Sequence, residues 1–138
     1  MSYRFLDHAT DAIIEVEGED LKEAFAVTAD AVINLTLDQD KVEEKQTKEF
    51  VAQGKDLHYL LFSWLEEIPF ILITEGFAIK RIEFDIEKKD IYKINAKAFG
   101  ENLDLKKHNF KVEIKAPTFH DMEIRNEDSV YMRFLLDL

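Results

Sequence analysis

The sequence predicts an α+β domain in which two principal helices pack on a mainly antiparallel or mixed β-sheet. Two stretches, residues 21–35 and 57–68, repeat apolar residues at helical spacing. The C-terminal half instead alternates apolar and charged residues, as half-buried strands do. The 138 residues contain no repeat, linker or low-complexity segment. We therefore expect residues 1–138 to form a single domain.

The N-terminal third predicts two strands followed by a helix. Residues 3–8 form a short strand, and residues 14–18 alternate apolar and acidic side chains in a second. Asp20 stands at the N-cap position of the helix over residues 21–35, and Glu23 follows it at capping-box spacing.

The charged stretch over residues 41–53 predicts a strand near a sheet edge, where charges discourage further pairing. Asp56 then caps the second helix over residues 57–68. Its apolar stripe consists of Leu57, Leu60, Leu61, Trp64, Leu65 and Ile68. Pro69 kinks or stops this helix, because it lacks an N–H group and its ring presses on the preceding turn. Residues 70–74 either resume the helix or continue as extended chain.

The C-terminal half predicts successive antiparallel strands. Pro117 allows a bulge or bend before the fourth of them, and a polar loop over residues 101–108 follows the second. The expected strands are residues 82–87, 92–98, 110–114, 118–124 and 130–136.

The charge balance constrains the partners. Asp and Glu number 29 against 18 Lys and Arg, so the formal net charge is −11. Such a surface repels phosphate backbones, which argues against direct nucleic-acid binding, and it attracts cations and basic protein surfaces. The simpler interpretation is that the acidity only aids solubility.

The composition also indicates a compartment. The chain has no Cys, which excludes disulfides and Cys-ligated zinc and suits a reducing environment. The longest uninterrupted apolar stretch, residues 68–73, is too short to span a bilayer, and the first residues do not resemble a signal peptide. A cytoplasmic protein that binds no membrane is the expectation.

Candidate functional residues lie at the ends of the predicted strands. The sequence offers no nucleophile motif, no phosphate-binding glycine loop and no His pair at helical metal spacing. The remaining polar residues at strand ends are Asp7, His8, Asp11, Glu101, Lys107, His108, His120 and Asp137.

The two acidic ends of the chain predict a cation site if they are neighbours. Asp11 precedes a strand, and Asp137 is the penultimate residue, so its oxygens lie close to those of Leu138. Hard oxygen donors suit Ca²⁺ or Mg²⁺. Without a cation, converging carboxylates repel and raise one another's pKa. Spacing alone favours the other interpretation, two unrelated solvated acids.

Three further residues leave alternatives open. His8 is a base, a ligand or a buried side chain, and His120 shares strand parity with Met122 and so is expected to be half-buried. Lys107, like the adjacent His108, lies in a loop, where polar residues are normally solvated. A metal-dependent hydrolase using His8, Asp11 and His120 is one alternative function, and a chaperone-like binding module for basic proteins is another.

Several motifs together resemble the archease family, and the similarity spans essentially the whole chain. Residues 7–11, Asp-His-Ala-Thr-Asp, resemble its Asp-His-Thr-Ala-Asp motif with the middle pair exchanged. Residues 21–25 resemble the start of its first helix, and residues 60–67 its second-helix pattern. The motifs that follow in the family's order are 74–76, Gly100-Glu101, Lys107-His108, 113–116, 118–122 and Asp137. The sequence departs from the family at Ala9-Thr10, Pro69 and Pro117.

The resemblance implies an accessory protein rather than an enzyme. Members of the family are protein cofactors of the RtcB-type RNA ligase in tRNA splicing, where they promote guanylylation of the ligase and its multiple turnover. The family's metal site corresponds to Asp11 and Asp137, with the carbonyl of Leu138 as a further ligand and calcium as the expected cation. Lys107 corresponds to a functional lysine, and the remaining motif positions expected to act on the partner are His8, Glu101 and His120.

Overall fold

The computed structural model describes residues 1–6 and 10–138, and it confirms an α+β domain with antiparallel strands. The strands form two sheets rather than the one that was predicted. The first has the order β1-β2-β7-β6 and the second β3-β5-β4. The strands are β1 (Ser2–Leu6), β2 (Asp11–Gly18), β3 (Gln46–Gly54), β4 (Phe77–Lys88), β5 (Tyr92–Asn102), β6 (Ala116–Asn126) and β7 (Val130–Asp137).

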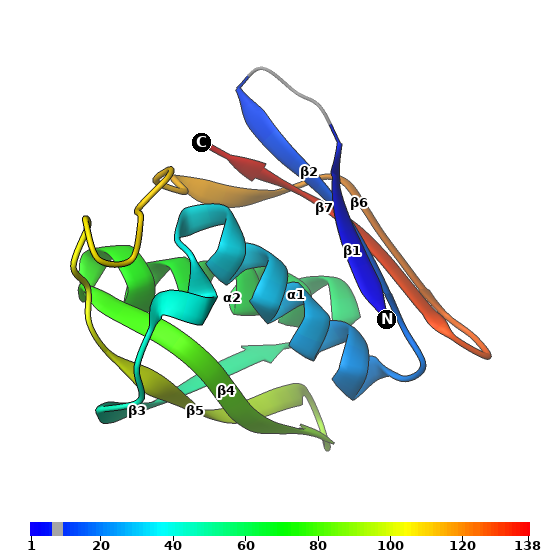
Figure 1. The fold of residues 1–138 in the computed structure, drawn as a ribbon. Helices are drawn as coiled ribbons and strands as arrows, with labels where there is room; N and C mark the ends of the chain where they lie inside the picture. The colour runs from blue at the N-terminus through cyan, green and yellow to red at the C-terminus, as the bar shows by residue number, and fades with distance from the viewer. Residues whose placement is uncertain (7–9) are drawn as a thin grey trace.

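The two helices, α1 (Leu21–Thr36) and α2 (Leu57–Pro69), lie between the two sheets (Figure 1). Helix α1 contacts β2 and β4, and α2 contacts β3 and β6, so each helix touches both sheets. Trp64 on α2 is fully buried at the centre, stacks on Phe50 of β3 and donates its indole N–H to the carbonyl of Phe25 at 3.0 Å. One continuous core therefore joins all three layers.

Both helices begin at the predicted caps. The Asp20 carboxylate accepts the N–H of Glu23 at 2.8 Å, and the Asp56 carboxylate accepts that of Tyr59 at 3.0 Å. The Glu23 carboxylate accepts the N–H of Glu19, one residue before the position that the capping box predicts. These bonds satisfy N–H groups that have no partner inside the helix.

Pro69 does not stop the second helix. The chain continues into a π-helical segment, η2 (Phe70–Thr74), because Pro69 lacks the N–H that a regular turn would use and the turn widens. The 18 residues Leu57–Thr74 are long and apolar enough to cross a membrane by length and composition alone. Their inward side chains, such as Trp64 and Leu65, are part of the central core, as in the core helix of a globular domain.

Three strand predictions need correction. Residues 39–41 form a short 3₁₀ helix, so β3 begins at Gln46, although it is an edge strand as expected. Residues 110–114 are irregular and form no strand ladder: the N–H of Phe110 donates to the carbonyl of Leu105, and the N–H of Lys111 donates to that of Thr36. Asp11 does not precede β2 but begins it.

Strand β6 contains a bulge, but it lies inside the strand and not before it at Pro117, which pairs with Leu136 in regular register. The pairing of β6 with β7 shifts between Thr118 and Glu123, and Asp121 has a positive φ of 56°. This residue breaks the alternation of side chains along the strand. His120 is therefore exposed and not half-buried, because it no longer shares the parity of Met122.

Candidate functional site

The two acidic ends of the chain meet. Strand β2 pairs antiparallel with β7, and the register places Asp11 directly opposite Asp137. The neighbouring residues Ala12 and Leu136 face the core, so the two aspartates lie on the outer face of the sheet. Directly opposed carboxylates repel one another unless a cation lies between them. We call this pair, together with Leu138, the acidic tip.

Two neighbouring segments, at Thr10 and at residues 115–116, hold the acidic tip in place. The N–H of Leu138 donates to the carbonyl of Thr10 at 3.2 Å, and the N–H of Lys115 donates to the carbonyl of Asp137 at 2.8 Å. Ala116, the first residue of β6, is also a register partner of Asp137. The end of β7 is therefore bonded on both sides, and the backbone that carries the Asp137 carboxylate is fixed.

The donor chemistry of the acidic tip fits a hard divalent cation in part. Asp11 and Asp137 supply carboxylate oxygens, and Leu138 adds its carbonyl oxygen. Calcium takes six to eight oxygen ligands, so these residues would share the site with water or further groups. Within residues 1–6 and 10–138, no group of three or more His, Asp and Glu side chains is arranged to hold a metal ion. His8 lies outside the described residues.

A second polar cluster surrounds Glu101 at the end of β5. Its carboxylate accepts the backbone N–H of Glu43 at 2.9 Å, a hydrogen bond from Lys107 Nζ at 3.0 Å and a third bond from His108 Nε2 at 2.9 Å. The Lys107 ammonium also binds the Glu43 carboxylate at 3.1 Å. We call these four residues the Glu101 cluster.

His108 is the buried centre of this cluster. Its Nδ1 accepts the N–H of Asp104 at 3.0 Å, so that nitrogen carries no proton, and its Nε2 must then donate to Glu101. The hydrogen bonds thus assign the neutral Nε2–H tautomer. The side chain is fully buried, which fixes the loop after β5 against the end of α1.

Three hydrogen bonds hold the pKa of Glu101 down to about 2, the largest contribution coming from the Glu43 N–H, followed by His108 and Lys107. The hydrogen bonds that Lys107 donates to the carboxylates of Glu101 and then Glu43 raise the pKa of Lys107. Nearby, hydrogen bonds from Lys111 and then Asn109 lower the pKa of Asp38 to about 2. The loop that carries Lys107 is therefore fastened by two ionised carboxylates.

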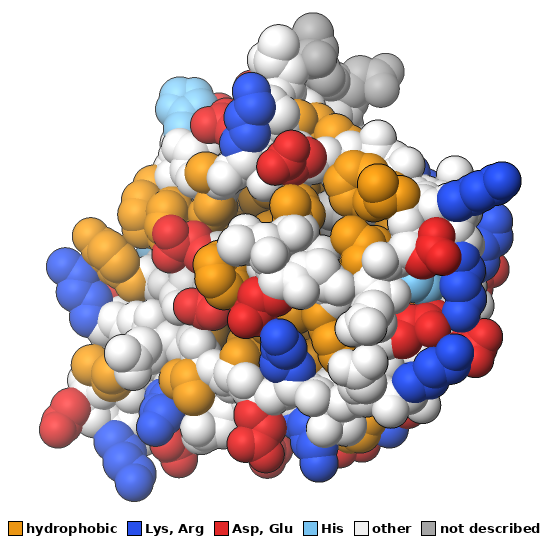
Figure 2. Space-filling view, turned by 90° about the vertical axis from the view of Figure 1, so that its left-hand side faces the viewer, with side chains coloured by type: hydrophobic (Ala, Val, Ile, Leu, Met, Phe, Trp, Pro, Cys, Tyr) orange, Lys and Arg blue, Asp and Glu red, His pale blue; other side chains and the backbone are white. Residues whose placement is uncertain are grey.

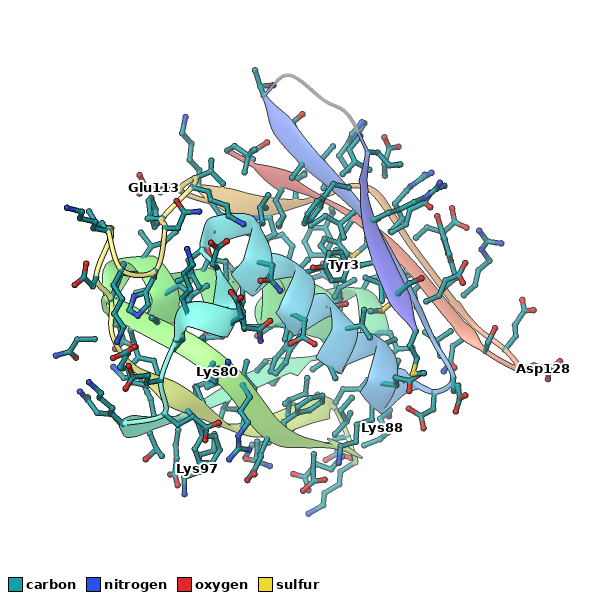
Figure 3. All side chains as sticks on the ribbon, viewed as in Figure 1. Tyr3, Lys80, Lys88, Lys97, Glu113 and Asp128 are labelled. Atoms are coloured by element: carbon teal, nitrogen blue, oxygen red, sulfur yellow. The ribbon has the colours of Figure 1, made fainter. Side chains whose placement is uncertain are left out.

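The structure divides the predicted site residues between these two clusters. Asp11 and Asp137 are brought together at the acidic tip, whereas Lys107 and Glu101 are bound to each other. Residues 111–115 connect the two clusters along the chain, with Ile114 buried in the core between them. Figure 3 shows Glu113 in this connection, on the side of the molecule where β7 ends.

The hydrolase alternative gains no support from the described residues. His120 is exposed on the bulge of β6, and the carboxylate within 3.2 Å of its Nε2 is that of Asp121, a chain neighbour. His8, the other histidine of that proposal, lies outside the residues that the structure describes. The metal-dependent hydrolase that uses His8, Asp11 and His120 therefore stays a prediction.

Sequence reasoning overlooked the structural role of His108 and all of the role of Glu43. The loop position of His108 predicted a solvated side chain. The loop instead folds back, so that the imidazole is buried and hydrogen-bonded to Glu101 of β5. Glu43 lies in a charged stretch without pattern. No local signal in the sequence distinguishes it from its acidic neighbours.

Comparison with known proteins gives one consistent result. The sequence profile of the Archease protein family matches residues 3–138. The protein archease of Pyrobaculum islandicum is 40% identical, covering 100% of this chain and 96% of that protein. The protein archease of Pyrococcus abyssi is 42% identical over 86% of this chain and 84% of its own length.

A solved structure shares the fold. The solution structure of protein 1598 of Methanobacterium thermoautotrophicum matches with a TM-score of 0.79 and 30% identity, covering 99% of each chain. The sequence match and the shared fold both extend over nearly the whole chain, so they do not depend on one motif. The chain belongs to the archease family.

Proposed function

We propose that this protein is an accessory protein that activates an RtcB-type RNA ligase in tRNA splicing, promoting guanylylation of the ligase and its multiple turnover. It does so without catalysing ligation. The observation that carries the proposal is the register that places Asp11 opposite Asp137, in a chain of the archease family. Those two residues are the ones to which the family's metal site corresponds.

The acidic tip binds a divalent cation, with calcium the expected ion. A bound cation removes the repulsion between the two opposed carboxylates and supplies a Lewis-acidic centre at the surface. Lys107 does not bind this ion, because its ammonium carries the same sign of charge. It is held by Glu101 and Glu43 and contacts the ligase from the Glu101 cluster, separately from the acidic tip.

Charge favours such a partner. A chain of net charge −11 is attracted to the basic surface of an RNA-handling enzyme and does not compete for its RNA. Activation further requires that this protein bind the nucleotide-accepting state of the ligase more tightly than its other states, since equal affinity shifts no equilibrium.

Ligase guanylylation measured with purified variants tests the proposal. Asp11→Ala and Asp137→Ala should each reduce stimulation roughly tenfold or more, equivalent to about 1.4 kcal/mol or more of lost coupling. Lys107→Ala should reduce it as well. The matched control is Asp128→Ala, which removes one carboxylate at the opposite end of the β6–β7 hairpin (Figure 3), about 25 Å from the acidic tip. Unchanged stimulation by both tip variants would sink the site assignment.

Calcium titration tests the cation separately. Because only the folded chain presents both carboxylates, Ca²⁺ at 100 times its Kd should stabilise the wild type by about 2.7 kcal/mol and raise its melting temperature. Asp137→Ala should lose this effect, and Asp128→Ala should keep it. A melting temperature that millimolar Ca²⁺ leaves unmoved would favour the chaperone-like binding module, in which these acids are merely solvated.

A further inference from the structure

A groove lies between the second helix and the segment that leads into β6. It encloses about 590 Å³, with one wall formed by α2 and η2 and the other by residues 113–117. Its apolar lining includes Leu65, Phe70, Ile73 and Pro117. Phe70 is 50% exposed, although its neighbours Ile71 and Leu72 are buried in the core.

The position of Phe70 along the helix explains its exposure. The buried stripe of α2 continues from Ile68 to Ile71 and Leu72, whereas Phe70 follows the exposed Glu66 by four residues and so lies on the outward face, where it lines the groove. The apolar surface extends beyond the groove. About two turns earlier on α2, Phe62 stacks on Phe119 of β6 with 4.2 Å between ring centroids, and Phe119 is 43% exposed.

The rim of the groove is acidic. Glu66, Glu67 and Glu113 line it together with one basic residue, Lys115. In the part of the chain that the structure describes, no ion pair joins these three carboxylates to a basic side chain. Burial and then the charges of Glu66 and Glu75 raise the pKa of Glu67, as expected for a carboxylate that lacks a cation. Figure 2 looks onto this side of the molecule and shows hydrophobic side chains exposed beside acidic ones.

The groove is continuous with the acidic tip. Its second wall contains Lys115, whose N–H binds the carbonyl of Asp137, and Ala116, whose register partner is Asp137. A segment seated in the groove would therefore lie beside the residues that the proposed function assigns to activation.

We propose that this groove docks a protein segment that presents an apolar side chain next to a lysine or arginine. The apolar side chain packs on Phe70 and Ile73, and the basic one pairs with Glu66 and Glu67. That this protein is the ligase rests on the proposed function. The apolar and basic character of the docked segment rests on the residues that line the groove. A second copy of this chain is disfavoured, because each copy carries a net charge of −11 and the two grooves would repel.

A synthetic amphipathic peptide of lysine and leucine, added to the isotope-labelled full chain, tests the groove by NMR. Resonances of Phe70, Ile73 and Pro117 should shift first and saturate together. The double variant Glu66→Gln/Glu67→Gln should bind about fivefold more weakly or worse, the range expected for two partly exposed ion pairs. Phe70→Ala should weaken binding about tenfold through lost aromatic packing.

Matched controls separate the groove from general acidity. Glu49→Gln/Glu127→Gln removes the same charge elsewhere and should change the affinity less than twofold, and a peptide of glutamate and leucine should not bind. The proposal is overturned if this control weakens binding as much as the groove variant, or if shifts spread over the acidic surface. Sedimentation could also overturn it, by showing that the free chain dimerises and that Phe70→Ala abolishes the dimer. Binding to neutral lipid vesicles without binding to the peptide would overturn it as well.

The ligase assay distinguishes the two possible failures. Groove variants should raise the concentration for half-maximal stimulation about fivefold or more and leave the maximum unchanged, whereas tip variants should lower the maximum. If the groove variants leave that concentration unchanged, docking of the ligase in the groove is wrong and the proposed function stands. If the wild type does not stimulate the ligase, the proposed function fails, and the peptide titration still decides the chemistry of the groove.

Discussion

At the residue scale, Glu101 is the carboxylate on which most contacts converge. It receives bonds from Glu43, Lys107 and His108, and the last of these is buried with a fixed tautomer. The carboxylate is essential to this arrangement, because a neutral amide has one acceptor oxygen and would turn its NH₂ donor toward the donors of Lys107 or His108. We infer that the cluster holds Lys107 in place as well as stabilising the loop.

Acid should weaken this cluster in a defined window. The folded-state pKa of Glu101 is about 2, below its ordinary value of 4.5. A depressed pKa contributes stability that is present above about pH 4.5 and lost as the pH falls towards 2. Glu101→Gln should lower the free energy of unfolding by about 1–3 kcal/mol at pH 7 and flatten its dependence on pH in that window. Urea unfolding between pH 6 and 3 measures both. A variant that follows the wild-type pH curve with a constant offset would contradict the assignment, and Glu127→Gln is the control.

At the element scale, the strand that carries Glu101 depends on a close approach of two backbones. A Cβ atom on Gly100 would overlap the backbone carbonyl oxygen of Ala78 in β4, next to the irregularity between Ile79 and Arg81. The carbonyl of Gly100 also accepts the N–H of Lys45 at 2.8 Å, which brings the Glu43 stretch to the cluster. Gly100 therefore positions Glu101 from both sides.

Gly100→Ala should consequently destabilise the fold by about 3 kcal/mol or more, the cost of overpacking against backbone that cannot move cheaply. The matched control is Gly76→Ala. Gly76 has a positive φ of 61° and open space around its Cβ position, so alanine there should cost only about 1–2 kcal/mol of backbone strain. Thermal unfolding of the two variants measures the difference. Equal costs would mean that β4 and β5 can separate to admit the methyl group.

At the scale of the whole molecule, the two sheets should unfold as one unit, because the same helices cover both. Trp64 reports on this, since it lies between the layers and is the only tryptophan in the chain. Its fluorescence and the far-UV circular dichroism should give coincident urea transitions. Separate midpoints would show that one sheet melts before the other. Trp64→Phe should cost about 2–3 kcal/mol, because it removes the hydrogen bond to Phe25 as well as packing volume.

The sequence by itself determined the elements whose signals are local. Capping residues such as Asp20 and Asp56 act on N–H groups three residues away, and apolar stripes repeat within one helix, so both helix starts were predictable. Alternation likewise predicted the inner face of β7. The proximity of Asp11 and Asp137 was a conditional expectation that the register now confirms.

Only the tertiary structure decided how distant segments share space. It split the strands into two sheets, buried His108 beneath β5, turned His120 outward at a bulge and opened the groove beside Phe70. Each of these outcomes depends on contacts between residues far apart in the chain. The energies of those contacts are set by burial and by distant partners, which the neighbouring sequence does not indicate. Local pattern fixes where a helix begins, but long-range packing fixes which side chains it leaves exposed.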